Sequence, residues 1–103
     1  MSEPVLHPEA TADIKDIWKY IATKSLDAAD RFREEIFKVL YSIEAFPNRG
    51  HIRPDLTTKP LRFHVVREYL IAYAPDEKPL VVIAVLHGRR NPLVISAILR
   101  GRA

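Results

Sequence analysis

The hydrophobic side chains of this chain change their period near residue 47. Before that point they recur every three or four residues, which is typical of an amphipathic helix. After residue 60 they alternate with polar residues or run without interruption, which is typical of strands. Between the two patterns, Pro47, Gly50, Pro54 and Pro60 break any regular structure, so residues 48–60 are predicted to form a loop. This order predicts an α+β fold, with helices first and a sheet after them.

Two helices are predicted in the first half of the chain, after a short strand at residues 5–6. Pro8 opens the first helix, and Ser25 is a good N-cap for the second, which Pro47 ends. The apolar stripe of the first helix contains Ala10, Ile14, Ile17, Trp18 and Ile21. That of the second contains Ala29, Phe32, Ile36, Val39, Leu40, Ile43 and Phe46. The short link between them predicts an antiparallel hairpin, with Trp18 in the core where the first helix meets the sheet.

Three longer strands are predicted in the second half, at residues 61–65, 69–74 and 80–87. A tight connection at residues 67–68 joins the first two, and a turn rich in proline and acids at residues 75–79 joins the last two. The unbroken apolar run of the third strand predicts a position in the centre of the sheet.

The end of the chain allows two interpretations. Asn91 and Pro92 suit the start of a short helix through Leu99. Val94 and Ile95 are β-branched, however, and favour an edge strand over the same residues. With the helix, Arg100 and Arg102 are expected to form a basic tail.

The length of 103 residues fits one domain, so residues 1–103 are predicted to fold as a unit. A domain this small buries a limited fraction of its surface, so a partner chain that stabilises it is expected. The absence of cysteine excludes disulfides and thiolate metal sites. The first residues lack the pattern of a signal peptide, and the longest apolar run is far too short to span a bilayer. A cytoplasmic location is therefore expected.

The charge is unevenly distributed along the chain. Residues 1–47 contain nine acidic and six basic side chains, whereas residues 48–103 contain four acidic and ten basic ones. The helical half is therefore acidic and the other half basic, although the net charge is only +3. This asymmetry predicts that the basic half meets an anionic partner.

Basic side chains recur along the predicted loop, the strands and the strand ends. They are Arg49, His51, Arg53, Arg62, His64, Arg67, His87, Arg89 and Arg90. His87 ends the central strand and is followed by a glycine and two arginines, which suits a flexible clamp on phosphates or carboxylates. We expect His87, Arg89 and Arg90 to bind the target, with Arg62 and Arg67 as a flanking basic patch.

No metal or cofactor site is predicted. The four histidines, His7, His51, His64 and His87, are far apart in the sequence and follow no ligand motif. Glycine-rich nucleotide-binding motifs and hydrolase motifs are absent from the sequence. Tyr69 and Tyr73 are expected to be packing residues that contact neighbouring strands.

Several segments, taken in order, form a recognisable series. They are Pro8-Glu9-Ala10, residues 13–22 (D-I-K-D-I-W-K-Y-I-A), Ala29 and Phe32, Phe46-Pro47 with Gly50, Leu61-Arg62, residues 69–73 (Y-L-I-A-Y) and residues 85–90 (V-L-H-G-R-R). The series resembles the ParE branch of the RelE/ParE toxins of bacterial type II toxin–antitoxin modules, over nearly the whole chain. The resemblance implies two helices packed on a curved antiparallel sheet, a ParD-like antitoxin that wraps the toxin, and DNA gyrase as target. Asn91 and Ala84 depart from the family, which often has Asp and a basic residue there.

Two other functions stay open beside gyrase inhibition. The RelE branch cleaves mRNA on the ribosome, and a metal-independent endoribonuclease would need a base, an acid and positive charge at the phosphate. His64, His87 and Tyr73 would supply the proton transfers, and Arg62 or Arg67 the charge. A nucleic-acid-binding module without catalysis is the third possibility. The resemblance favours the gyrase inhibitor, which acts by binding rather than as an enzyme.

Overall fold

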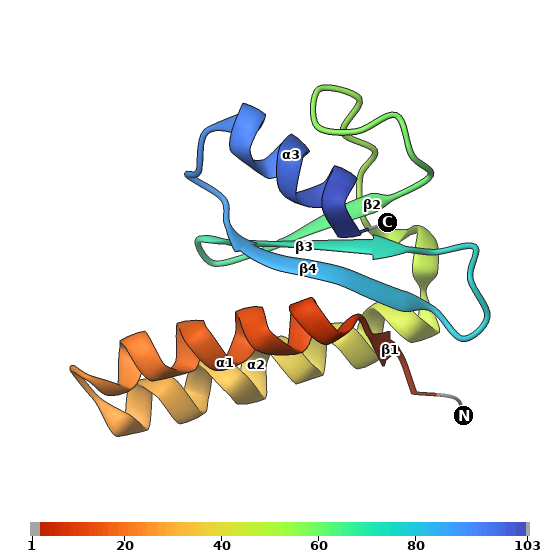
Figure 1. Cartoon of the computed structure of the whole chain (residues 1–103). Coiled ribbons are helices and arrows are strands. Elements are labelled where there is room, and N and C mark those ends of the chain that lie inside the picture. The colour runs from red at the N-terminus through yellow and green to blue at the C-terminus, as the bar shows by residue number, and fades with distance from the viewer. Residues whose placement is uncertain (1–2, 103) are drawn as a thin grey trace.

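The computed structural model describes residues 3–102 (Figure 1). The elements follow in the order β1 (Val5–Leu6), α1 (Pro8–Ala22), α2 (Leu26–Ala45), the 3-10 helix η1 (Pro47–Arg49), β2 (Arg62–Val66), β3 (Tyr69–Ala74), β4 (Val81–His87) and α3 (Pro92–Arg102). The helices and strands predicted between residues 5 and 87 are all present, and the strand bounds differ from the prediction by at most one residue. Within residues 3–102, no helix is both long enough and apolar enough to cross a membrane.

The four strands form one sheet in the order β1-β4-β3-β2. β4 lies inside the sheet, as predicted, and only its two end residues are partly exposed. β2, β3 and β4 pair in antiparallel fashion, whereas β1 runs parallel to β4 and pairs with it at Val81 and Val82. The predicted α+β fold is confirmed, and the sheet is mixed because β1 joins it in parallel.

Helices cover both faces of the sheet (Figure 1). The α1–α2 hairpin lies against one face and α3 against the other. Ile36 and Leu40 of α2 pack in a hydrophobic core with Ile71 of β3. On the opposite face, Leu99 of α3 packs in a second core with Leu70 of β3. Since side chains alternate between the faces of a strand, β3 and β4 contribute to both cores.

Residues 92–102 form α3, so the helix interpretation is confirmed and the edge-strand interpretation is wrong. Asn91 begins the helix, because its Oδ1 accepts a hydrogen bond from the N–H of Leu93 at 2.9 Å. Ile95 and Leu99 are one helical turn apart, and both are buried against the sheet. Burial of this stripe outweighs the strand preference of β-branched residues. Arg102 belongs to this helix and not to a tail.

Trp18 lies outside both cores, so its predicted place between α1 and the sheet is wrong. Its indole is half-buried between α1 and α2, where Nε1–H donates to Oδ1 of Asp30 at 3.1 Å. It lines an open hollow of about 400 Å³ together with Ile14 and Phe37. Ile14 and Ile17 face the core from α1. Successive residues of a helix are rotated by about 100°, so Trp18, which follows Ile17, points away from that core. The indole N–H finds its polar partner there on α2.

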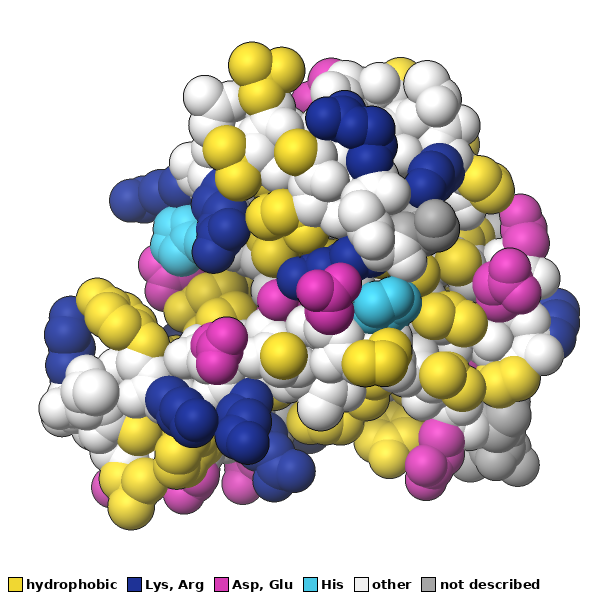
Figure 2. Space-filling view, in the orientation of Figure 1, with side chains coloured by type: hydrophobic (Ala, Val, Ile, Leu, Met, Phe, Trp, Pro, Cys, Tyr) yellow, Lys and Arg dark blue, Asp and Glu magenta, His cyan; other side chains and the backbone are white. Residues whose placement is uncertain are grey.

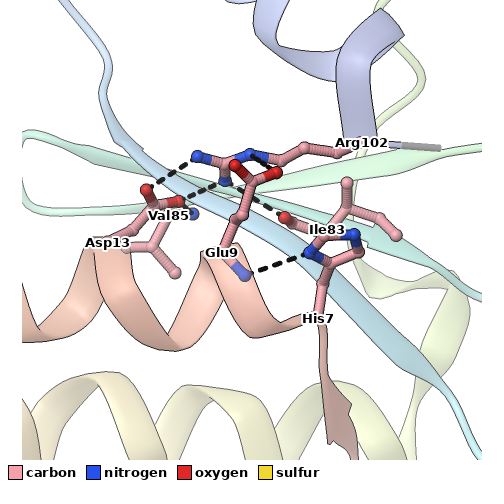
Figure 3. A network of polar contacts seen from close by, with 6 residues as sticks. All are labelled: His7, Glu9, Asp13, Ile83, Val85 and Arg102. Atoms are coloured by element: carbon pink, nitrogen blue, oxygen red, sulfur yellow. Dashed lines mark hydrogen bonds and ion pairs between the residues drawn. The ribbon is translucent and has the colours of Figure 1, made fainter.

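A mostly buried ion pair ties α3 to α1 and to β4 (Figure 3). Asp13 accepts hydrogen bonds from both terminal nitrogens of Arg102, with Nη2 and Oδ1 2.9 Å apart. The side chains of Arg102 and Asp13 are only 11% and 14% exposed. Asp13 also accepts a bond from the N–H of Val85 at 3.0 Å, and Arg102 donates to the carbonyl of Ile83 at 3.2 Å. The pair therefore joins three elements through side chains and backbone together.

Candidate target-binding surface

The chain leaves β4 through a folded turn that exposes two arginines. The N–H of Gly88 donates to the carbonyl of Glu68 at 2.8 Å, and the N–H of Arg90 donates to the carbonyl of His87 at 3.1 Å. A Cβ on Gly88 would lie 3.3 Å from the oxygen of Glu68, so the glycine permits this close approach. Within residues 3–102, the guanidinium groups of Arg89 and Arg90 form no hydrogen bond or ion pair.

We call His87, Arg89 and Arg90 the strand-end surface. Figure 2 shows lysine or arginine side chains beside a histidine at the end of the sheet where β4 leads into α3. Exposed hydrophobic side chains lie next to them on the beginning of α3. The surface therefore presents free positive charge and apolar area side by side.

The ring of His87 is held on three sides. It contacts the ring of Tyr69 edge-on, with centroids 5.7 Å apart. Its Nδ1 accepts a hydrogen bond from the N–H of Arg89 at 3.2 Å, so Nε2 carries the proton of the neutral ring. That Nε2 lies 3.6 Å from Oε2 of Glu68. His87 thus shapes the turn that displays the arginines.

The two arginines of the predicted flanking patch have internal partners. Arg67 forms an ion pair with Glu35 of α2, and this contact raises the pKa of Arg67. Arg62 donates from Nη1 to the carbonyl of Gly50 at 2.7 Å. Both guanidinium groups hold the sheet to other parts of the fold, which distinguishes them from Arg89 and Arg90.

The hydroxyl of Tyr73 also forms hydrogen bonds inside the fold. Its hydroxyl donates to the carbonyl of Pro47 at 2.8 Å and accepts a bond from the N–H of Gly50 at 2.8 Å. Burial raises the pKa of this phenol. A Cβ on Gly50 would lie 2.6 Å from the hydroxyl oxygen, so this contact requires glycine. Tyr73 and Arg62 together fasten the segment that follows α2.

Of the four residues of the possible nuclease site, Arg62 and Tyr73 face each other across β2 and β3, whereas His87 lies apart on β4. His64 lies on β2 and His87 on β4, with β3 between them, so two strand spacings of about 10 Å in total separate their strands. Burial lowers the pKa of His64, and the nearby Arg49 and His51 lower it further. Asp16 and Glu68 line the same cleft as His87, and their carboxylates would repel an RNA phosphate. Among residues 3–102, His64 and His87 are therefore not brought to one phosphate position.

The strand-end surface lies between two clefts. One, of about 620 Å³, is formed with α1 and contains His87 and Arg90 beside Asp16 and Glu68. The other, of about 380 Å³, lies on the α3 side and is lined by Arg89 and Arg90. Within the described part of the chain, no three histidine, aspartate or glutamate side chains are grouped as metal ligands would be.

A protein-family model described as ParE toxin of type II toxin-antitoxin system, parDE, matches residues 5–92. The chain belongs to this ParE toxin family. No curated protein matches the chain. Family membership confirms the resemblance seen in the sequence and implies a ParD antitoxin as partner.

The ParE match runs from β1 to the first residue of α3. It includes the strand-end surface and the fastening of residues 47–50 by Tyr73, but it ends before Arg102. Sequence reasoning found the arginines of the surface and missed the contacts of Tyr73 and Arg102. The sequence held one indication of the Tyr73 contact. Gly50 comes three residues after Pro47, and a glycine at such a position indicates a close approach of another group to the backbone.

Proposed function

We propose that this ParE-family toxin inhibits DNA gyrase by binding it through the strand-end surface, and that a ParD-like antitoxin neutralises it. The observation that carries the proposal concerns the guanidinium groups of Arg89 and Arg90. They have no partner among residues 3–102, and they lie on a turn fixed by backbone hydrogen bonds. Arginine on a pre-ordered backbone is well suited to dominate a protein interface. The function is that of a binding inhibitor acting in the cytoplasm, with residues 1–103 as one toxin domain.

The alternative of an mRNA endonuclease draws less support from the geometry. The hydroxyl of Tyr73 bonds two backbone groups, and the guanidinium of Arg62 donates to the carbonyls of Asn48 and Gly50. A general acid or base must reach the reacting atom within hydrogen-bond distance. His64 and His87 are separated by a strand, so they do not form such a constellation with the others.

The antitoxin is proposed to lay a helix and a strand across the helical hairpin and the sheet. The hollow between α1 and α2 offers apolar area at Trp18 and Phe37 beside the cations Lys15 and Arg33. Val5 of the edge strand β1 is 46% exposed, so this edge is open to a partner strand. Expression of the chain alone should slow bacterial growth, and co-expression of its antitoxin should restore it.

The decisive experiment compares two activities of the purified chain, inhibition of supercoiling by gyrase and ribosome-dependent mRNA cleavage. The proposal expects the first activity and not the second. The double change Arg89→Ala with Arg90→Ala should abolish gyrase inhibition while shifting the free energy of unfolding by less than about 0.5 kcal/mol, since both side chains are exposed. Arg31→Ala with Lys38→Ala, on the exposed face of α2, removes the same charge and should leave inhibition intact.

His87→Ala separates the two functions further. In a gyrase inhibitor, loss of the ring loosens the turn and raises the inhibitory concentration. In a nuclease that used His87 as acid or base, cleavage would fall on the order of a hundredfold while RNA binding was retained. Full gyrase inhibition by a folded double-arginine variant would rule out the strand-end surface as the binding site.

A further inference from the structure

The cleft on the α3 side of the strand-end surface has an apolar floor and an arginine rim. Leu56, Val65, Leu70 and Ile95 form the floor. The rim carries Arg53, Arg67, Arg89 and Arg90, together with Glu68. We call this the arginine-rimmed cleft.

The rim has an excess of positive charge that the fold does not neutralise. Arg53 pairs with Asp55 and Arg67 with Glu35. Among the described residues that line the cleft, Glu68 alone carries a carboxylate, and it lies beside His87. Arg89 and Arg90 therefore remain as two positive charges without internal partners in the described residues.

Exposed apolar side chains lie on β2 in the cleft and on the first turn of α3, which begins at Pro92 in its lining. Val65 on β2 is 64% exposed, and Leu93 and Val94 on the first turn of α3 are 78% and 45% exposed. Burial of such aliphatic side chains against another apolar surface lowers the free energy of the complex. A phosphate backbone offers no such surface, whereas a protein segment does.

Val65 also lies on an open strand edge. The backbone of Phe63 exchanges two hydrogen bonds with His51 on the outer side of β2, each at 2.8 Å. Two residues further along, the backbone of Val65 points the same way. Within residues 3–102, no backbone or side chain is bonded to it there. This edge can accept one more strand.

We propose that the arginine-rimmed cleft binds an extended acidic segment of the target protein. The segment pairs with the edge of β2 at Val65, places carboxylates against Arg89 and Arg90, and lays an apolar side chain over Val65 and Leu93. This rests on the proposed function and names the chemistry of the partner. Single-stranded nucleic acid is disfavoured because such sites stack bases on exposed aromatic rings, and the only ring in this cleft, Tyr69, is buried.

The test uses the whole chain, labelled with ¹⁵N, and three probes. The first is the peptide acetyl-Glu-Val-Glu-Val-Glu-amide, and the second has serine in place of both valines at the same charge. The third is a short single-stranded DNA. The first peptide should shift the amide signals of Val65, Arg89 and Leu93, and should bind about tenfold more tightly than the second, as burial of an aliphatic side chain predicts.

Variants of the cleft give the matched comparison. Val65→Ser with Leu93→Ser should weaken binding of the first peptide to the level of the second. Ile52→Ser with Leu26→Ser changes two side chains of similar exposure, 64% and 60%, that do not line the cleft, and should leave binding unchanged. Equal binding of the two peptides, tighter binding of DNA to these amides, or no shift at millimolar peptide would overturn the proposal.

The same variants in the supercoiling assay separate this inference from the proposed function. If the chain inhibits gyrase and the Val65 and Leu93 variant inhibits equally well, the cleft proposal fails and the gyrase proposal stands. If the acidic peptide binds in the cleft and gyrase is not inhibited, the cleft stands and the target is another protein.

Discussion

At the scale of single residues, Tyr73 connects two parts of the chain that local structure does not join. Its hydroxyl satisfies the carbonyl of Pro47 and the N–H of Gly50, in a site closed to solvent by the surrounding core. A buried backbone group without a partner is costly. The phenol oxygen of Tyr73 therefore holds η1 in place after α2, together with the guanidinium of Arg62.

Tyr73→Phe should lower the free energy of unfolding by about 1–3 kcal/mol, because two backbone groups lose their partner while the ring is kept. Urea unfolding followed by circular dichroism measures this change. Tyr41→Phe removes the same atom from a side chain that is 51% exposed, and should have little effect. Equal stability of the two variants would mean that water replaces the hydroxyl of Tyr73.

Contacts between single side chains are the part of the structure that the sequence predicts least well. The position of Arg67 in a tight turn follows from the sequence, but its partner Glu35 is 32 residues away, on a helix that packs across the sheet. The sequence does not distinguish Arg89 from Arg62. In the fold, the guanidinium of Arg62 donates to two carbonyls, whereas that of Arg89 has no partner among residues 3–102. Such differences come from tertiary packing, which no local pattern contains.

At the scale of elements, α3 is held by its apolar stripe and by Arg102. The stripe was predictable from the spacing of Ile95 and Leu99, although β-branching made a strand equally plausible. The ion pair was not predictable, because Asp13 and Arg102 are 89 residues apart. Both side chains are mostly shielded from solvent, so removal of one would leave the other as an uncompensated charge, which is strongly destabilising.

Arg102→Met should therefore lower the free energy of unfolding by about 3 kcal/mol, the low end for a broken buried pair, because both side chains keep slight exposure. Urea unfolding gives the value. Adding Asp13→Asn should recover part of the loss, since the uncompensated carboxylate is gone and an amide oxygen can still accept from Val85. Arg100→Met, on the exposed side of the same helix, should change stability by less than about 0.5 kcal/mol. A double variant no more stable than Arg102→Met alone would contradict this account.

At the scale of the whole molecule, two hydrophobic cores share one sheet. The α+β order, the helical hairpin and the central position of β4 all follow from the period of the hydrophobic residues, and the structure has them. The parallel pairing of β1 does not follow from any period, because two residues are too few to show one. The side of the sheet that α3 covers also could not be predicted, because it depends on packing between elements that are distant in the sequence.

Because β3 and β4 supply side chains to both cores, the two layers should unfold together. Trp18, the only tryptophan, reports on the helical hairpin through its fluorescence. Amide hydrogen exchange of residues 95–102 reports on α3. Fluorescence in urea and exchange of α3 should give the same free energy of unfolding. A clearly lower value for α3 would show that this helix opens independently of the sheet.

β1 pairs with β4 only at Val81 and Val82. Within residues 3–102, the edge of β4 that faces away from β3 therefore has no neighbouring strand from residue 83 onward. Arg102 and Asp13 occupy the carbonyl of Ile83 and the N–H of Val85 on that edge. An uncovered strand edge is a template on which a second copy of the same chain can add its own strand and begin to aggregate. The ion pair that fastens α3 thus also keeps copies of this toxin apart, and its loss would show as precipitation at high concentration as well as in the unfolding curve.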